Sequence, residues 1–157
     1  MKIELVMIGK TDEKYLIQGI EKYLQRLKHY ISFKMTTIPD LKNTKNLSED
    51  QQKKLEGDQI LSQLQPGDQL ILLDENGKEF NSVGFSDFIE KKMISGLKRL
   101  VFVIGGPYGF SDEVYKKANQ KISMSQMTFS HQMVRLFFTE QVYRAMTILK
   151  NEPYHHQ

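Results

Sequence analysis

The chain has 157 residues, a length that fits one domain built around a single hydrophobic core. Its 39% hydrophobic and 26% charged residues are typical of globular proteins and exclude the disordered and fibrous classes. Because there is no cysteine, disulfides, thiolate metal sites and a cysteine nucleophile are excluded. The net charge of +3 is compatible with a nucleic-acid partner, but many enzymes of other classes share it.

The beginning of the chain predicts a soluble, cytoplasmic protein. Residues 2–8 alternate as a strand and lack the apolar stretch of a signal peptide. No run approaches the roughly 20 apolar residues that a membrane helix needs. Apart from the adjacent His155 and His156, the histidines show no metal-ligand spacing, so we expect no metal site.

Strands and helices are predicted to alternate along the whole chain. Strands are expected at residues 2–8, 33–38, 69–73, 100–104 and 121–124. Helices are expected at residues 16–27, 48–65, 85–93, 111–118 and 131–149, and a mobile polar loop at 40–46. This alternation predicts an α/β fold with a largely parallel sheet. No linker or repeat divides the chain, so we expect a single domain over residues 1–157.

Two of the predicted helices carry a more detailed expectation. Ser48 and Gln51 form a capping-box pattern, and the core face of the helix that follows is expected to comprise Leu55, Ile60, Leu61 and Leu64. The final helix is apolar around most of its circumference, so it must be buried on most sides. A second subunit that covers one side is the favoured explanation, and the alternative is a central helix buried within one chain.

Three loops are candidates for a ligand site, because ligands of parallel sheets gather at the carboxyl ends of the strands. They follow Leu73, Ile104 and Met124. Gly105-Gly106 would let the backbone approach a ligand closely, although an ordinary turn explains the pair equally well. It is neither a Walker motif nor a dinucleotide fingerprint. Residues 123–130 offer backbone donors and thioether surface for a sulfonium cofactor, or form an ordinary loop with a helix cap.

Polar side chains near both ends of the last helix could act on a substrate. His131 and Arg135 lie one turn apart and could bind phosphate or polarise a base, or could be a plain surface pair. Glu140 and Arg144, also one turn apart, are predicted to form a structural ion pair. The tail at residues 153–157 could stack on a base or handle a proton, or could be a frayed end.

The order and spacing of several motifs over the whole chain resemble the RlmH (YbeA-like) family of SPOUT-class methyltransferases. The most specific are Phe102-Val103-Ile104-Gly105-Gly106 with Gly109, Ser123-x-Ser125-x-Met127-Thr128, His131-Gln132 with Arg135, Glu140-Gln141-x-Tyr143-Arg144-Ala145, and Pro153-Tyr154-His155. Shorter matches are Gly9-Lys10, Tyr23, Arg26-Leu27, Glu56-Gly57, Ile60-Leu61, Leu73-Asp74 and Gly77-Lys78. The resemblance implies a SPOUT α/β fold with a C-terminal trefoil knot and a homodimer. It also implies S-adenosylmethionine as cofactor and methylation of N3 of a pseudouridine in the helix 69 loop of 23S rRNA, on the assembled ribosome.

The same resemblance implies a set of site residues. The cofactor would be bound by Leu73, Gly105, Met124, Ser125, Gln126, Met127, Thr128 and Phe129. The catalytic, substrate-side residues would be His131, Arg135, Tyr154 and His155, with the tail reaching the partner's cofactor site. Two positions depart from the family pattern: Ser130 replaces a usual Pro, and His156 replaces a usual basic residue.

Two other functions remain open on the sequence. One is a non-catalytic RNA-binding or ribosome-binding dimer with a decayed cofactor site, against which the intact Gly105-Gly106 pair argues. The other is a flavodoxin-like nucleotide-binding module, against which the absence of a phosphate-loop motif argues. Removal of the N3 proton would be helped by a general base, for which His131 and His155 are equal candidates beside a carboxylate or water.

Overall fold

A single five-stranded sheet organises the molecule, as seen in a computed structural model that describes residues 1–156. Its strands are β1 (Lys2–Ile8), β2 (Ser32–Ile38), β3 (Gln69–Glu79), β4 (Arg99–Ile104) and β5 (Gln120–Ser123). They lie in the order β2-β1-β4-β3-β5, and every pair of neighbours is parallel. The predicted α/β fold with a parallel sheet is therefore confirmed.

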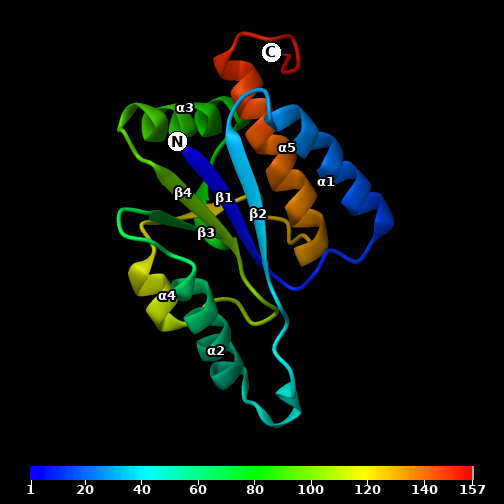
Figure 1. Ribbon diagram of the computed structural model, residues 1–157, viewed down its shortest axis with the longest axis vertical. Helices are drawn as coiled ribbons and strands as arrows, with labels where there is room; N and C mark the ends of the chain where they lie inside the picture. The colour runs from blue at the N-terminus through cyan, green and yellow to red at the C-terminus, as the bar shows by residue number, and fades with distance from the viewer. Residues whose placement is uncertain (157) are drawn as a thin grey trace.

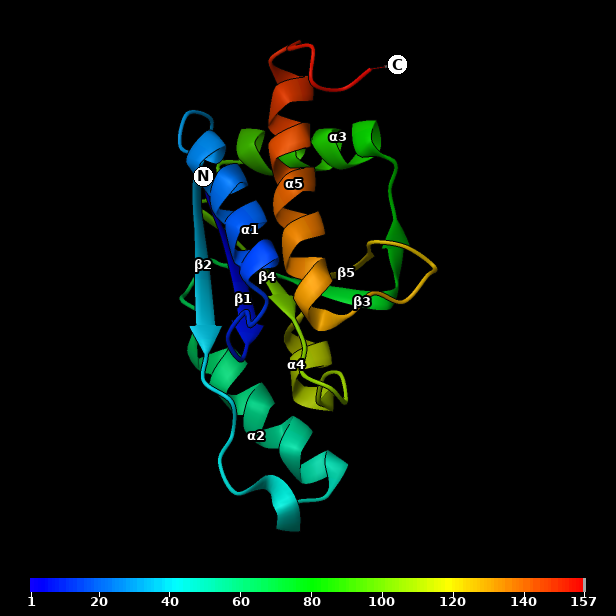
Figure 2. The same cartoon turned by 90° about the vertical axis from the view of Figure 1, so that its right-hand side faces the viewer.

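Helices cover both faces of this sheet. They are α1 (Lys14–Leu27), α2 (Glu49–Ser62), α3 (Ser82–Ile94), α4 (Asp112–Lys117) and α5 (His131–Leu149), with a short 3-10 helix at Thr44–Asn46. Helices α1, α3 and α5 share one hydrophobic cluster with the sheet, while α2 and α4 share the other. Figures 1 and 2 show α1 and α5 side by side, with α3 crossing near the C-terminal part of α5.

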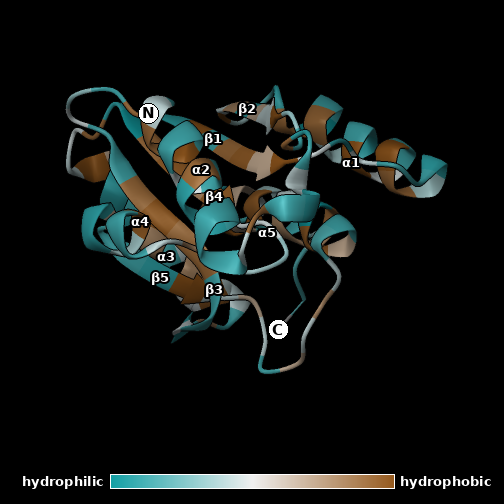
Figure 3. Cartoon of the chain, turned by 90° about the horizontal axis from the view of Figure 1, so that it is seen from below, coloured by the Kyte–Doolittle hydropathy of each residue, from teal (hydrophilic) through white to brown (hydrophobic). Residues whose placement is uncertain are grey.

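The central strand β4 shows why the sheet is covered on both sides. Leu100 and Phe102 belong to the cluster under α5, whereas Val101 and Val103 belong to the cluster under α2 and α4. All four side chains are fully buried. The continuously apolar run therefore forms a strand with two dry faces, as predicted. Figure 3 shows the strands in hydrophobic colours between helices whose outer faces are mostly hydrophilic.

Strand β3 differs from its prediction, which ended it at Leu73 before a turn. The strand instead continues to Glu79, with a register shift between Leu73 and Lys78 where it pairs with β5. Within this bulge, the Asn76 backbone N–H donates to Asp74 Oδ1 at 2.8 Å. The polar residues therefore loop out of a continuing strand, because a bulge can absorb extra residues without ending the ladder.

Helix α2 confirms its predicted start and corrects its predicted core face. The capping box is present, with Ser48 Oγ accepting from the Gln51 backbone N–H and the Gln51 side chain accepting from the Ser48 backbone N–H. Leu55 was wrongly placed in the core, since it is 43% exposed. Glu56 is buried in its place, one turn before the buried Ile60. Neighbouring positions on a helix point in different directions, so only one of Leu55 and Glu56 can face the core.

Smaller differences concern two loops. The polar segment 40–46 contains the 3-10 helix rather than being wholly irregular. Strand β5 ends at Ser123, so Met124 belongs to the loop that follows it. Within residues 1–156, no helix combines the length and the apolar character that a membrane span requires.

Most of the apolar surface of α5 is covered by other elements of the same chain. Phe138, Val142 and Met146 are buried under α1 and α3. On the α1 side, a Cβ added at Gly19 would lie 3.0 Å from Leu136 Cδ1, so glycine lets the two helices approach. Intrachain packing thus explains most of the pattern that favoured a second subunit. The trefoil knot stays a prediction, because strand order and helix packing fix neighbours and not how the chain threads.

Replacement of Gly77 tests the β3 bulge. A Cβ at this position would lie 2.5 Å from the backbone N and C of Ile122, so Gly77→Ala must push β3 and β5 apart. We expect the free energy of unfolding to fall by about 1–3 kcal/mol, as overpacking typically costs, in urea denaturation. Asn76→Ala, at an exposed neighbouring position, serves as the control and should change it by less than about 0.5 kcal/mol. Equal stability of the two variants would contradict the close approach.

Candidate functional site

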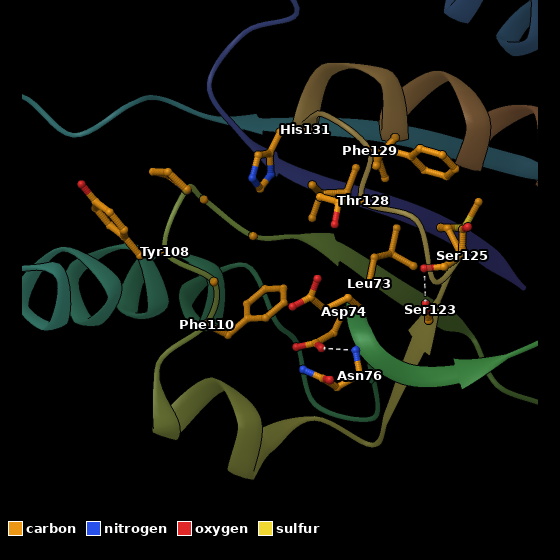
Figure 4. Close-up of a pocket in the computed structure, with 18 of the residues that line it drawn as sticks. Leu73, Asp74, Asn76, Tyr108, Phe110, Ser123, Ser125, Thr128, Phe129 and His131 are labelled. Atoms are coloured by element: carbon orange, nitrogen blue, oxygen red, sulfur yellow. Dashed lines mark hydrogen bonds between the residues drawn. The ribbon is translucent and has the colours of Figure 1, made fainter.

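A cavity of about 450 Å³ lies beside the bulge of β3, at the carboxyl end of β4 and beyond β5. It is lined by residues 73–76, 104–110, 123–125 and 127–129, with Tyr115 and the first turn of α5. These are the three loops expected from the sequence, and they converge because parallel strands end at the same edge of the sheet. Figure 4 shows Leu73, Asp74, Phe110, Thr128 and His131 around this cavity.

Most of the predicted cofactor residues line the cavity. They are Leu73, Gly105, Met124, Ser125, Met127, Thr128 and Phe129. Gln126 does not belong to the lining. The loop after β5 is shaped by its own serines: Ser123 Oγ donates to the Ser125 carbonyl at 2.9 Å, and Ser125 Oγ accepts from the Met127 backbone N–H at 3.0 Å.

The glycine-rich loop after β4 turns sharply beside the cavity. Gly109 adopts a φ of +82° and donates its backbone N–H to the Gly106 carbonyl at 3.1 Å. This left-handed conformation is available to glycine at little cost. A Cβ added at Gly105 would lie 3.1 Å from Phe110 Cζ, so the Phe110 ring packs directly against the bare backbone. Tyr108, at the tip of the turn, is 45% exposed at the rim of the cavity.

Glu56 supports this loop from behind, and the sequence analysis assigned it no role. Its carboxylate oxygens would lie 2.5 and 2.7 Å from a Cβ at Gly106, so the glycine makes room for the acid. Burial raises the pKa of the Glu56 carboxyl. A hydrogen bond with Gln52 acts in the opposite direction, and the negative charge of Asp40 raises the pKa further. The Glu56-Gly57 motif was visible in the sequence, but its packing partner lies 50 residues away (106 − 56) and leaves no local signal.

The charges around the cavity have one predominant sign. Asp74 and Glu75 line it, whereas no Lys or Arg belongs to the lining among residues 1–156. Tyr115 donates its hydroxyl to Asp74 Oδ2 at 2.5 Å. Burial, followed by this hydrogen bond, raises the pKa of Tyr115 to about 12, so the phenol stays a neutral donor at physiological pH. The lining therefore suits a cationic ligand better than a phosphate.

His131 and Arg135 share a helix stripe, but only His131 lines the cavity. Arg135 is 2% exposed, and its guanidinium donates to the Ile8 carbonyl at 2.8 Å and to Thr11 Oγ1 at 3.0 Å. Burial lowers the pKa of Arg135, while the charges of Asp12 and Asp40 act in the opposite direction. Spacing could show that the two residues share a face, but not that the loop after β1 covers one of them.

The C-terminal tail is anchored to α5 through the predicted ion pair. Arg144 Nη2 lies 2.6 Å from Glu140 Oε1, which confirms that pair. Tyr154 donates to the same Glu140 oxygen at 2.9 Å, and its ring lies 4.7 Å from the Arg144 guanidinium carbon. His155 Nδ1 lies 3.2 Å from Arg144 Nη1. The side chains of Tyr154 and His155 are thus held in place rather than frayed, and Gln157 lies outside the described residues.

The anchored tail and the cavity lie at opposite ends of α5. His131 begins this helix beside the cavity, and the tail follows its last residue, Leu149. Tyr154 contacts Glu140, which follows His131 by nine residues (140 − 131), or about 14 Å along the helix axis. Neither Tyr154 nor His155 belongs to the lining of the cavity in their own chain. Figure 1 shows the C-terminal tail at the end of α5 that lies opposite its first turn. Within residues 1–156 there is also no group of three or more His, Asp or Glu side chains that could hold a metal ion.

Comparison with known proteins identifies the family. A family model described as a predicted SPOUT methyltransferase matches residues 1–155. The chain is 68% identical to the ribosomal RNA large subunit methyltransferase H of Flavobacterium psychrophilum, 67% to that of Christiangramia forsetii and 66% to that of Parabacteroides distasonis. Each alignment covers 100% of both chains. The chain therefore belongs to the SPOUT methyltransferase family.

Proposed function

We propose that this chain is an S-adenosylmethionine-dependent methyltransferase that acts in the cytoplasm on large-subunit ribosomal RNA, as one domain over its whole length. The observation that carries the proposal is the cavity in which three loops bring together most of the predicted cofactor residues. The substrate class is supported by relatives named ribosomal RNA large subunit methyltransferase H, which match from end to end. The motif resemblance extends the proposal to N3 of a pseudouridine in the helix 69 loop of 23S rRNA, on the assembled ribosome.

The residues of the cavity fit this cofactor. Leu73, Met124 and Phe129 offer apolar surface for an adenine ring, and the loop backbones offer donors and acceptors. When bound, S-adenosylmethionine supplies an electrophilic methyl group on a cationic sulfonium. Asp74 and Glu75 give the cavity a charge that matches such a cation and disfavours phosphates. This charge argues against the flavodoxin-like alternative, because that class binds a phosphate-bearing ligand.

The geometry favours different roles for the two candidate histidines. Arginine only donates hydrogen bonds, so His155 Nδ1 must accept from Arg144, and its proton then lies on Nε2. We propose that His155 donates this Nε2–H to a carbonyl of the target base. His131, which lines the cavity and is exposed, is then the better candidate to accept the N3 proton. Holding donor and acceptor in line supplies much of the remaining rate enhancement.

We propose a homodimer, because the two parts of the proposed site lie apart in one chain. The cavity is at the start of α5, whereas the anchored tail packs against Glu140 and Arg144 in the second half of the helix. A second copy whose tail reaches across the cavity would bring Tyr154 and His155 to the cofactor. We therefore propose a homodimer with composite sites, in which Arg135 acts indirectly by holding the loop after β1.

Cofactor binding is tested with Gly105→Val. The new side chain would collide with the Phe110 ring at the wall of the cavity, so we expect at least about a hundredfold weaker binding of S-adenosylmethionine by calorimetry. Gly67→Val is the control: it introduces strain at a φ of +86° where a Cβ meets open space, far along the chain from the cavity loops. Affinity lost equally in both variants would indicate general destabilisation instead of a direct effect.

The tail is tested by deleting residues 153–157. Since the deletion leaves α5 and the cavity loops intact, light scattering should still give a dimer mass and cofactor affinity should be unchanged. Methyl transfer should fall severely, because substrate-side groups act mainly in the transition state. Mixing the truncated chain with Gly105→Val should restore partial activity, since the heterodimer pairs one intact cavity with the other chain's tail. Full activity of the truncated homodimer, or a monomer mass for the intact chain, would refute the composite site.

Glu140 is proposed as a positioning residue for the tail. Glu140→Gln removes the charge that pairs with Arg144, so the tail should open more often. We expect kcat to fall roughly tenfold, as loss of a charge-assisted hydrogen bond typically costs, with cofactor affinity unchanged. Amide exchange at residues 154–156 should accelerate in parallel. Glu90→Gln, at an exposed position of α3, is the control and should match the wild type in both measurements. Slow amide exchange retained in Glu140→Gln would exclude the positioning role.

A further inference from the structure

Asp74 is the most firmly held charge of the cavity. It follows Leu73, at the point where β3 loops out of its ladder. Its Oδ1 accepts the Asn76 backbone N–H at 2.8 Å, and its Oδ2 accepts the Tyr115 hydroxyl at 2.5 Å. Both donors are neutral, so they orient the carboxylate without cancelling its charge. Its neighbour Glu75 is exposed, and solvent therefore screens its charge more strongly.

No cation of the lining compensates Asp74. Lys121 Nζ lies 5.5 Å from the centre of the Tyr115 ring, and Lys121 does not line the cavity. His131 is the only lining side chain that could become positive within residues 1–156. A carboxylate fixed in this way is an incomplete ion pair, and a bound cation would complete it.

Resting on the proposed function, we infer that Asp74 determines the preference of the cavity for the cationic cofactor over its uncharged product. In methyl transfer the sulfur–methyl bond breaks and its electron pair stays on sulfur. The new bond forms with the electron pair of the target nitrogen, whose proton passes to a base. S-adenosylmethionine, at net charge +1, thus becomes S-adenosylhomocysteine, at net charge zero, and the attraction to Asp74 is lost. The used cofactor would then leave more readily, and product release often limits such enzymes.

The strength of the attraction to Asp74 limits how far the affinities for the two ligands can differ. The attraction between two unit charges is strong in a cavity of low dielectric constant, but the partial exposure of Asp74 lets solvent screen it. We therefore expect Asp74 to contribute roughly a tenfold ratio between the affinities for the two ligands.

The test is calorimetry of S-adenosylmethionine and S-adenosylhomocysteine with the full-length protein and Asp74→Asn. Asparagine has the same shape, and its amide can still accept from Asn76 and donate to the Tyr115 oxygen. We expect about tenfold weaker binding of S-adenosylmethionine and nearly unchanged binding of S-adenosylhomocysteine. The preference of the wild type should also shrink with added salt, whereas that of Asp74→Asn should not.

Two control variants separate charge from structure. Asp87→Asn makes the same chemical change at an exposed position of α3 and should alter neither affinity. Tyr115→Phe removes one hydrogen bond but keeps the charge, so it should retain most of the preference. An unchanged ratio in Asp74→Asn, or an equal loss for both ligands, would overturn the inference alone. Failure of the wild type to bind either ligand would overturn the proposed function and this inference with it.

Discussion

The burial of α5 against the sheet is the contact on which the rest of the molecule depends. Phe138 of α5 meets Phe102 of β4 with ring centroids 4.7 Å apart, and both side chains are fully buried. Helix α5 starts after the loop that follows β5, so its first turn lies near the carboxyl ends of the strands, and this contact holds it there. Its last turn must lie at the opposite end of the sheet. The placement of His131 beside the cavity, and of the tail away from it, follows from this geometry.

Two polar side chains of α5, the buried Arg135 and the partly buried Glu140, hold the neighbouring segments. Near the start of the helix, Arg135 donates to Ile8 and Thr11 and so ties the loop after β1 to the helix. At the middle of the helix, Glu140 accepts from both Arg144 and Tyr154. Burial, followed by the hydrogen bonds with Tyr23 and Glu140, raises the pKa of Tyr154, so the phenol remains a donor. Charge-assisted hydrogen bonds are the stronger ones, which explains how so short a tail is held.

The distribution of charge separates the two halves of the proposed site. The cavity carries Asp74 and Glu75 and lacks Lys and Arg among its described lining, whereas Arg144 lies with the tail. A cationic cofactor and an anionic RNA would thus meet surfaces of opposite character. Glu56, which lies behind the glycine-rich loop, adds little charge to the cavity because burial favours its neutral form.

The sequence by itself determined which segments are strands and helices, where three loops converge and which motifs resemble the family. The apolar run of β4, the capping box at Ser48 and the spacing of Glu140 and Arg144 are local signals, and each is confirmed. Tertiary structure decided what covers each face. Leu55 is exposed and Glu56 buried because Gly106 and α4 lie against that side of α2. Arg135 is removed from the cavity by a loop more than 120 residues away. Periodicity reports that a side chain faces inward or outward, whereas its partners come from distant segments that only the folded chain brings together.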